Sequence, residues 1–179
     1  MNKFEMTSNT KAIPGIGIVR QIRALVDIHA HNVKKGDLGG WLRFPSNLSQ
    51  SGDSWVADDA VIGGAESMVA QNALVCDSAL VKDSYVGGDT IISGKARVVG
   101  CNLEGTGNLI GENATLKKVN INGKAITING QAHVERLEIT IQAFHISIGE
   151  NARVQNTKKH LVIAGHTIRI EGNPHLENC

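Results

Sequence analysis

The chain has 179 residues, a length that fits one domain or one domain with a small appendage. Its 18 Lys and Arg residues nearly balance its 17 Asp and Glu residues, and the formal net charge of +1 excludes a nucleic-acid binder that acts through a strongly basic overall field. Aromatic residues make up only 3% of the chain while glycines number 20, a composition that suits a thin β-structure with tight corners.

Targeting signals and cysteine usage bear on where the protein works. Residues 1–11 lack the apolar stretch and the cleavage site of a signal peptide, and no apolar run approaches the roughly 18 residues that span a bilayer. The three cysteines, Cys76, Cys101 and Cys179, show neither a CxxC nor a Cys/His metal spacing, so we expect reduced thiols. The sequence therefore predicts a cytoplasmic protein.

Residues 1–54 lack the repeat that follows and are expected to form an N-terminal cap. Residues 1–11 are polar and expected to be loosely held, whereas residues 16–28 favour β-structure because Ile and Val dominate them. Glycines surround Asp37, which predicts a sharp turn. Aromatic residues then gather just before the first repeat and are expected to cover its exposed strand edges: Trp41, Phe44 and Trp55.

Aliphatic residues recur every 18 positions through residues 55–156. One column consists of Val56, Leu74, Ile92, Ile110, Ile128 and Ile146. A second column, six residues further on, consists of Ile62, Leu80, Val98, Leu116, Val134 and Ala152. A third column, with a one-residue slip, consists of Met68, Val86, Leu103, Ile121 and Ile139. A spacing of six fits neither a helix nor a long strand, but it fits short strands separated by turns and stacked in coils. We predict an all-β parallel β-helix with about 18 residues per coil and five to seven coils.

Residues 157–179 are expected to form a terminal coil and a tail. Residues 161–163 and 168–170 have the composition of short strands, and the Gly-Asn-Pro sequence at residues 172–174 ends regular structure.

Two sets of motifs point to a family. Ile110-Gly-Glu-Asn-Ala-Thr-Leu116 and Ile148-Gly-Glu-Asn-Ala-Arg-Val154 resemble the repeat of bacterial hexapeptide transferases, whose prism winds left-handedly. Val33-Lys-Lys-Gly-Asp-Leu-Gly-Gly-Trp41, followed by Trp55-Val56, is similar to the N-terminal signature of YdcK-type hexapeptide-repeat proteins of bacteria, phages and prophages. The resemblance covers about residues 18–156. It implies a left-handed β-helix, and its phage-type kinship implies a rod that engages a host protein.

The transferases with this repeat use a His as general base, because neutral imidazole can take a proton near pH 7. They bind the acyl carrier between subunits of a trimer and extrude a loop from one coil to enclose the substrate. The columns between Val56 and Ile146 leave no room for such a loop. His145, in a string that resembles the transferase motif, is the candidate base if the protein is an acyltransferase, and acyl-CoA is then the cofactor.

The other histidines do not indicate a functional site. His145, His160 and His166 invite comparison with the γ-class carbonic anhydrases, which bind zinc through three His, but residues six apart fall on adjacent faces of the prism, so no metal site is predicted. His133 is expected to project into solvent, and His29 and His31 are expected to be loop residues with a hydrogen-bonding role.

These observations predict a non-catalytic β-helical scaffold or protein-interaction module without a cofactor. Each flat face of a prism can pack against a neighbour, so we expect a homo-oligomer, specifically a trimer. A host protein is a further candidate partner, while membrane and nucleic acid are not expected. The alternative is an acyl-CoA-dependent acyltransferase with its site at a subunit interface.

Overall fold

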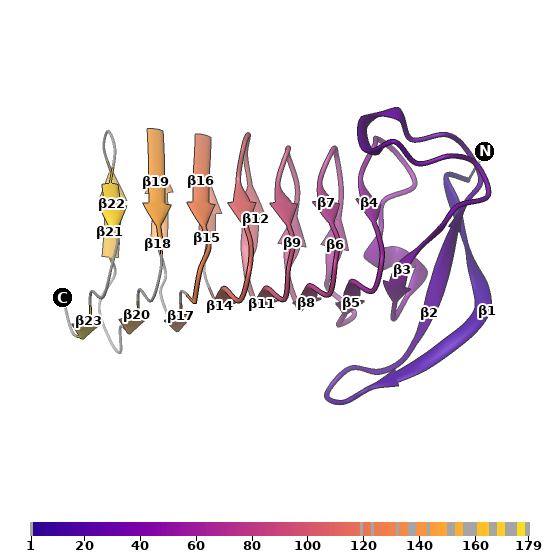
Figure 1. Ribbon diagram of the computed structural model, residues 1–179, viewed down its shortest axis with the longest axis horizontal. Helices are drawn as coiled ribbons and strands as arrows, with labels where there is room; N and C mark the ends of the chain where they lie inside the picture. The colour runs from indigo at the N-terminus through magenta and orange to yellow at the C-terminus, as the bar shows by residue number, and fades with distance from the viewer. Residues whose placement is uncertain are drawn as a thin grey trace.

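Short strands stacked in three sheets make up most of the molecule, as the computed structural model shows (Figure 1). The structure describes residues 2–118, 120–122, 124–131, 133–135, 139–142, 144–149, 153–155, 161–164, 168–170 and 175–177. Its side chains are described for residues 2–118, 125–131, 147 and 149. Within these residues the helical elements are two short 3-10 turns, η1 (His29–His31) and η2 (Pro45–Asn47). Neither has the length or apolar character that a membrane crossing requires.

Each coil contributes one strand to each sheet, in parallel with the coils before and after it. The ten-stranded sheet consists, in spatial order, of β1 (Phe4–Ile13), β2 (Gly17–Ala24), β3 (Leu38–Leu42), β5 (Val61–Gly63), β8 (Leu80–Lys82), β11 (Arg97–Val99), β14 (Thr115–Lys117), β17 (His133–Glu135), β20 (Arg153–Gln155) and β23 (His175–Glu177). The seven-stranded sheet consists of β4 (Trp55–Val56), β7 (Leu74–Val75), β10 (Ile91–Ile92), β13 (Leu109–Ile110), β16 (Lys124–Ile128), β19 (Phe144–Ile148) and β22 (Ile168–Ile170). The six-stranded sheet consists of β6 (Met68–Val69), β9 (Tyr85–Val86), β12 (Asn102–Glu104), β15 (Asn120–Asn122), β18 (Ile139–Gln142) and β21 (Leu161–Ala164).

The molecule is a β-solenoid, and the predicted fold class is confirmed. Stacked aliphatic side chains fill its interior. In the seven-stranded sheet the paired residues along the inner column are Val56, Val75, Ile92, Ile110, Ile128 and Ile148. The five of these with described side chains are at most 1% exposed. Each contributes about 1.5 to 3 kcal/mol by burial, mainly against the coils on either side of it.

The predicted columns are correct for Val56 and Ile62 and in the middle of the stack, and they are wrong in the second coil and at the far end. At the second coil the inner residues are Val69, Val75 and Val81, in place of the predicted Met68, Leu74 and Leu80. At the far end the paired residues are Ile141, Ile148 and Val154, in place of Ile139, Ile146 and Ala152.

Unequal corners cause these errors. The corner between Ile62 and Val69 is longer than the hexapeptide spacing and the one between Val81 and Val86 is shorter, so the two cancel and the average length of a coil is unchanged. Beyond Ile128 the coils lengthen, since Ile128 pairs with Ile148 and not with the predicted Ile146, and Ile148 in turn pairs with Ile170.

Acidic side chains stabilise one corner of the prism. Asp58, Asp77, Gly94 and Glu112 stack there with positive φ angles of 52°, 58°, 65° and 54°. The backbone N–H of Asp77 donates to Asp58 Oδ2 at 3.1 Å, and that of Gly94 donates to Asp77 Oδ2 at 2.7 Å. The carboxylates of Asp58 and Asp77 therefore each tie their own coil to the next one.

The strands of the N-terminal segment pair differently from those of the coils. β1 pairs with β2 and β2 with β3 in antiparallel orientation, and β3 then pairs with β5 in parallel. The expectation of β-structure in residues 16–28 is confirmed by β2, whereas the expectation that residues 1–11 are loosely held is wrong. Phe4 is buried, and Lys3 Nζ donates to the carbonyl oxygens of Ser54 at 2.8 Å and Gly52 at 3.2 Å. Burial lowers the pKa of Lys3 to about 8.

The aromatic residues of this segment have different environments. Trp55 is 1% exposed, and its ring lies so close to Gly39 that a side chain there would meet Trp55 Cζ2 at 2.6 Å. Trp41 is half-buried: its Nε1 donates to Asp59 Oδ1 at 3.1 Å, and Lys11 Nζ lies 4.2 Å from its ring centre. Lys11 also pairs with Asp59 at 2.9 Å, which ties β1 to the first coil. Of these two tryptophans only Trp55 is fully covered, so the aromatic cover of the prism end is partial.

Candidate protein-interaction face

Four successive strands of the seven-stranded sheet are built entirely from large apolar residues. In β4, β7, β10 and β13 the second residue points into the prism, so the first takes the opposite side. Outward Ile91 and Leu109 are 39% and 38% exposed, and Leu74 is half-buried. Small uncharged residues follow the inner column on the same side: Ala57, Cys76, Ser93 and Gly111. We call these seven outward residues, from Ala57 to Gly111, the apolar face.

The two other sides of the prism differ from the apolar face. Outward positions of the ten-stranded sheet include Lys82, Arg97 and Lys117 beside Leu80 and Val99. Those of the six-stranded sheet are Met68 in β6 and Tyr85 in β9, but Asn102 and Glu104, both exposed, in β12. Within the coils whose side chains the structure describes, the apolar face is thus the side that costs least to remove from water.

Strand spacing sets the size of this face. Its four strands lie about 4.8 Å apart, so it is about 14 Å tall. The strand that follows, β16, continues the outward column with Thr127 but begins with Lys124. A hydrophobic centre bounded by polar groups has the anatomy of a protein-interaction surface rather than of a substrate cleft.

The corner beside this face brings three groups with metal-binding atoms together. Asp58, Cys76 and Asp77 each place one such atom within 4.8 Å of the others. Burial first, and then the Asp77 and Asp58 carboxylates, raise the pKa of the Cys76 thiol to about 11, so it stays protonated at neutral pH. Because both carboxylates already accept backbone hydrogen bonds in the corner, a cation would compete with the turn for them. We assign them a structural role.

Within the described residues the cysteines form no disulfide, which agrees with the expectation of reduced thiols for Cys76 and Cys101. Cys101 is buried at another corner of the prism. Its backbone N–H donates to Ser84 Oγ at 3.0 Å, and its thiol donates to the Val99 carbonyl oxygen at 3.3 Å. These contacts give Cys101 a structural role, and Cys179 lies outside the described residues.

The structure describes the backbone of two of the four histidines of the coils, His133 and His145. His145 lies in β19 and His133 in β17, both on the ladders of stacked strands, but their side chains are outside the described set. His160 and His166 lie outside the described residues altogether. The candidate general base therefore stays a prediction.

His31 is confirmed as a loop hydrogen-bonding residue. Its Nε2 lies 3.1 Å from the Asn72 carbonyl oxygen, which joins η1 to the second coil. Burial lowers the pKa of His31, and the hydrogen bond to Asn72 opposes that shift only in part. His29 lies in the same 3-10 turn.

Strand pairing tests the expectation that no coil contains an inserted loop. From β4 to β16 every strand of the seven-stranded sheet pairs with the strand of the next coil, and the paired positions keep close to the predicted repeat. Between these strands there is no room for an extruded loop of the kind that encloses substrate in hexapeptide transferases. The later coils, from β16 to β19 and from β19 to β22, are only slightly longer.

No family model matches the chain, and no curated protein matches it either. The class of protein that the structure defines is a parallel β-solenoid, and its coil length and stacked parallel strands are consistent with a hexapeptide-repeat β-helix. The narrower likeness to YdcK-type proteins rests on the N-terminal residues alone.

The apolar face is not among the predicted sites, although the sequence contains a signal for it. The predicted columns place one large apolar residue of each hexapeptide in the interior. Trp55-Val56, Leu74-Val75, Ile91-Ile92 and Leu109-Ile110 instead repeat a pair of large apolar residues. One member of each pair must face outward in a strand.

Proposed function

We propose that the protein is a non-catalytic β-helical scaffold and protein-interaction module that associates with itself through the apolar face. The observation that carries this proposal is the column of outward Leu74, Ile91 and Leu109, set among small uncharged residues on a flat sheet. Partly exposed aliphatic side chains gain free energy when a partner covers them, at about 25 cal/mol per Å². A flat, rigid face requires little ordering on binding, so less of that gain is lost.

Symmetry bears on the number of subunits. In a two-fold dimer the apolar face of one subunit packs against the same face of the other. In a cyclic trimer one patch of each subunit contacts a different patch of its neighbour. A second patch that spans four coils, as the apolar face does, would have to include Lys82 and Arg97, or Asn102 and Glu104, which are costly to desolvate without partners. The face therefore fits a dimer better than the predicted trimer, and the mass in solution distinguishes the two.

The size of the face sets the strength that we expect. Each partner of a standard stable complex buries about 800 Å², and a strip about 14 Å tall offers less than that. We therefore expect self-association that depends on concentration in the micromolar range. A host protein, the partner that phage-type kinship implies, would compete for the same face.

Sedimentation equilibrium over a series of concentrations tests the proposal. We expect the wild type to shift from the 19.1 kDa monomer to a multiple of that mass as concentration rises. Leu109→Lys places a charge on the apolar face and should leave only monomer. The matched control is Asn102→Lys, which adds the same side chain to an exposed position of the six-stranded sheet and should associate like the wild type. Wild-type protein that stays monomeric throughout, or a Leu109→Lys variant that associates normally, contradicts the proposal.

A separate measurement tests the absence of catalysis. Acetyl-CoA and succinyl-CoA are expected to leave the melting temperature of the protein unchanged. A rise in melting temperature that disappears in His145→Ala would instead support the acyltransferase alternative.

A further inference from the structure

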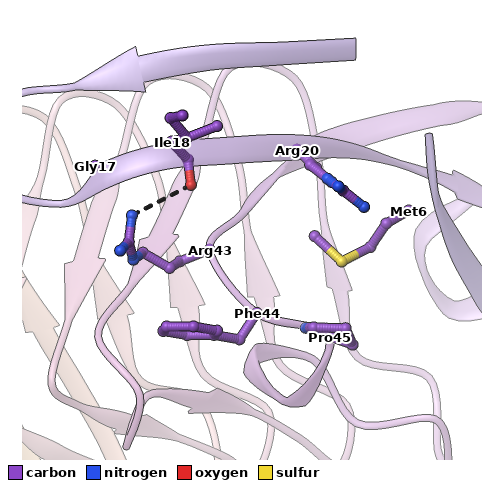
Figure 2. A pocket seen from close by; sticks show the side chains of 7 residues that line it. All are labelled: Met6, Gly17, Ile18, Arg20, Arg43, Phe44 and Pro45. Atoms are coloured by element: carbon purple, nitrogen blue, oxygen red, sulfur yellow. Dashed lines mark hydrogen bonds between the residues drawn. The ribbon is translucent and has the colours of Figure 1, made fainter. Parts of the chain in front are cut away.

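A pocket lies outside the coils, between β2 and the segment that follows β3, and the apolar face does not include it (Figure 2). Its volume is about 640 Å³, within the range of small-molecule sites. It is lined by Met6, Gly17, Ile18, Arg20, Arg43, Phe44 and Pro45. The Phe44 ring and Pro45 lie on one side, and Ile18, which is 63% exposed, lies across from them.

Arg43 is fixed at one end of this pocket. Its Nη1 donates to the Ile18 carbonyl oxygen at 3.4 Å, and its guanidinium carbon lies 5.3 Å from the centre of the Phe44 ring. A side chain at Gly17 would overlap the guanidinium, and Gly17 also has a positive φ of 101°, so glycine both shapes the turn and admits Arg43. The guanidinium is therefore positioned before any ligand arrives.

Arg20 lies at the other end, beside Met6. Arg23, three residues further along β2, pairs with Glu5 at 3.4 Å. Arg20 and Arg43 have no carboxylate at ion-pair distance within the part of the chain that the structure describes. Two uncompensated guanidinium groups thus flank an apolar pocket.

We propose that this pocket binds a carboxylate carried on an apolar body. The guanidinium fork matches the planar carboxylate and forms charge-assisted hydrogen bonds to it. Phe44, Pro45, Ile18 and the Met6 thioether cover the apolar part, and a thioether adapts to ligands of different shape. The proposal does not depend on self-association, since the pocket and the apolar face share no residue.

Titration with octanoate, followed by NMR of protein labelled at the methionine methyl groups, tests the proposal. The chain has three methionines, and Met6 alone among them lines the pocket, while Met68 is an outward residue of β6 and reports on non-specific binding. We expect the Met6 signal to shift and saturate while the Met68 signal changes little. Octanamide, which has the same shape without the charge, should bind at least about tenfold more weakly, because each charge-assisted hydrogen bond is worth about a factor of ten.

Two arginine variants and one control complete the experiment. Arg20→Gln and Arg43→Gln should each weaken octanoate binding by about tenfold and leave octanamide binding unchanged. Arg97→Gln, which removes an exposed cation from the ten-stranded sheet, should bind octanoate like the wild type. Because Arg20 is exposed and makes no ion pair to Asp or Glu in the described chain, its variant is expected to fold. Equal binding of octanoate and octanamide, equal weakening by Arg97→Gln, or a Met6 signal that octanoate does not shift would overturn the proposal.

Discussion

The coils and the N-terminal segment are held together in different ways. In the coils the same kind of contact recurs at every level, since each inner aliphatic residue packs against its counterparts above and below. In the N-terminal segment each contact occurs once: Lys3 bonds to the Ser54 carbonyl, and Asn47 Nδ2 donates to the carbonyls of Gly64 and Ser67, both at 2.8 Å. A repeated contact produces a period in the sequence, and a single contact does not. Damage to the coils should therefore propagate, whereas damage to the N-terminal segment should stay local.

The largest expected effect comes from a charge in the inner column. Ile110→Asp places an unpaired carboxylate in a site that is 0% exposed and should cost more than about 4 kcal/mol, enough to unfold a protein of ordinary stability. Circular dichroism and chemical denaturation measure the loss.

The adjacent residue provides a matched control for that variant. Leu109→Asp makes a nearly identical change one position earlier, on the outward side of the same strand, and should remain folded. If both variants unfold, or if neither does, the alternation of inner and outer residues is wrong.

A smaller effect is expected where the N-terminal segment meets the first coil. A Cβ added at Gly40 would meet the Ala60 carbonyl oxygen and Val56 Cγ1, both at 2.7 Å, so Gly40→Ala should cost about 1 to 3 kcal/mol. At Gly111, in a coil, the nearest such atom is Ser93 Oγ at 3.4 Å, so Gly111→Ala should change stability by less than about 0.5 kcal/mol. Thermal denaturation of the two variants compares the junction with the coils, and a Gly40→Ala variant as stable as Gly111→Ala would count against the close packing of β3 on the first coil.

The smallest effect concerns the single contact of His31. Its pKa is lowered in the folded protein, so below the ordinary value near 6.5 the unfolded chain binds a proton that the native state resists. The free energy of unfolding of the wild type should therefore fall as the pH decreases through 6.5, and the fall should be smaller in His31→Asn. Urea denaturation between pH 7.5 and about 5 measures both slopes; identical slopes would show that His31 is not shielded from protonation.

The architecture could be predicted because the aliphatic residues that are buried in a narrow prism recur at a nearly constant spacing in the sequence. The prediction that Leu74 and Leu80 face inward is wrong because each is followed by a Val that fits the interior equally well. The average spacing between apolar residues does not show which member of such a pair faces inward. The prediction also failed for the strand β1, whose pairing depends on a partner strand and not on its own polar composition.

The candidate sites were less predictable than the fold. The apolar face follows from alternation within two-residue strands and becomes visible only once the inner residue of each pair is known. The pocket between Arg20 and Arg43 is lined by residues from β2 and from the segment after β3. No local sequence motif indicates that these two segments lie close together.

The mass of the protein in solution tests the central claim most directly. Sedimentation equilibrium should show the wild type and Asn102→Lys assembling with rising concentration, and Leu109→Lys remaining at 19.1 kDa. A wild type that remains at 19.1 kDa at every concentration, or assembly that Leu109→Lys leaves intact, would contradict the claim that the apolar face joins copies of this chain.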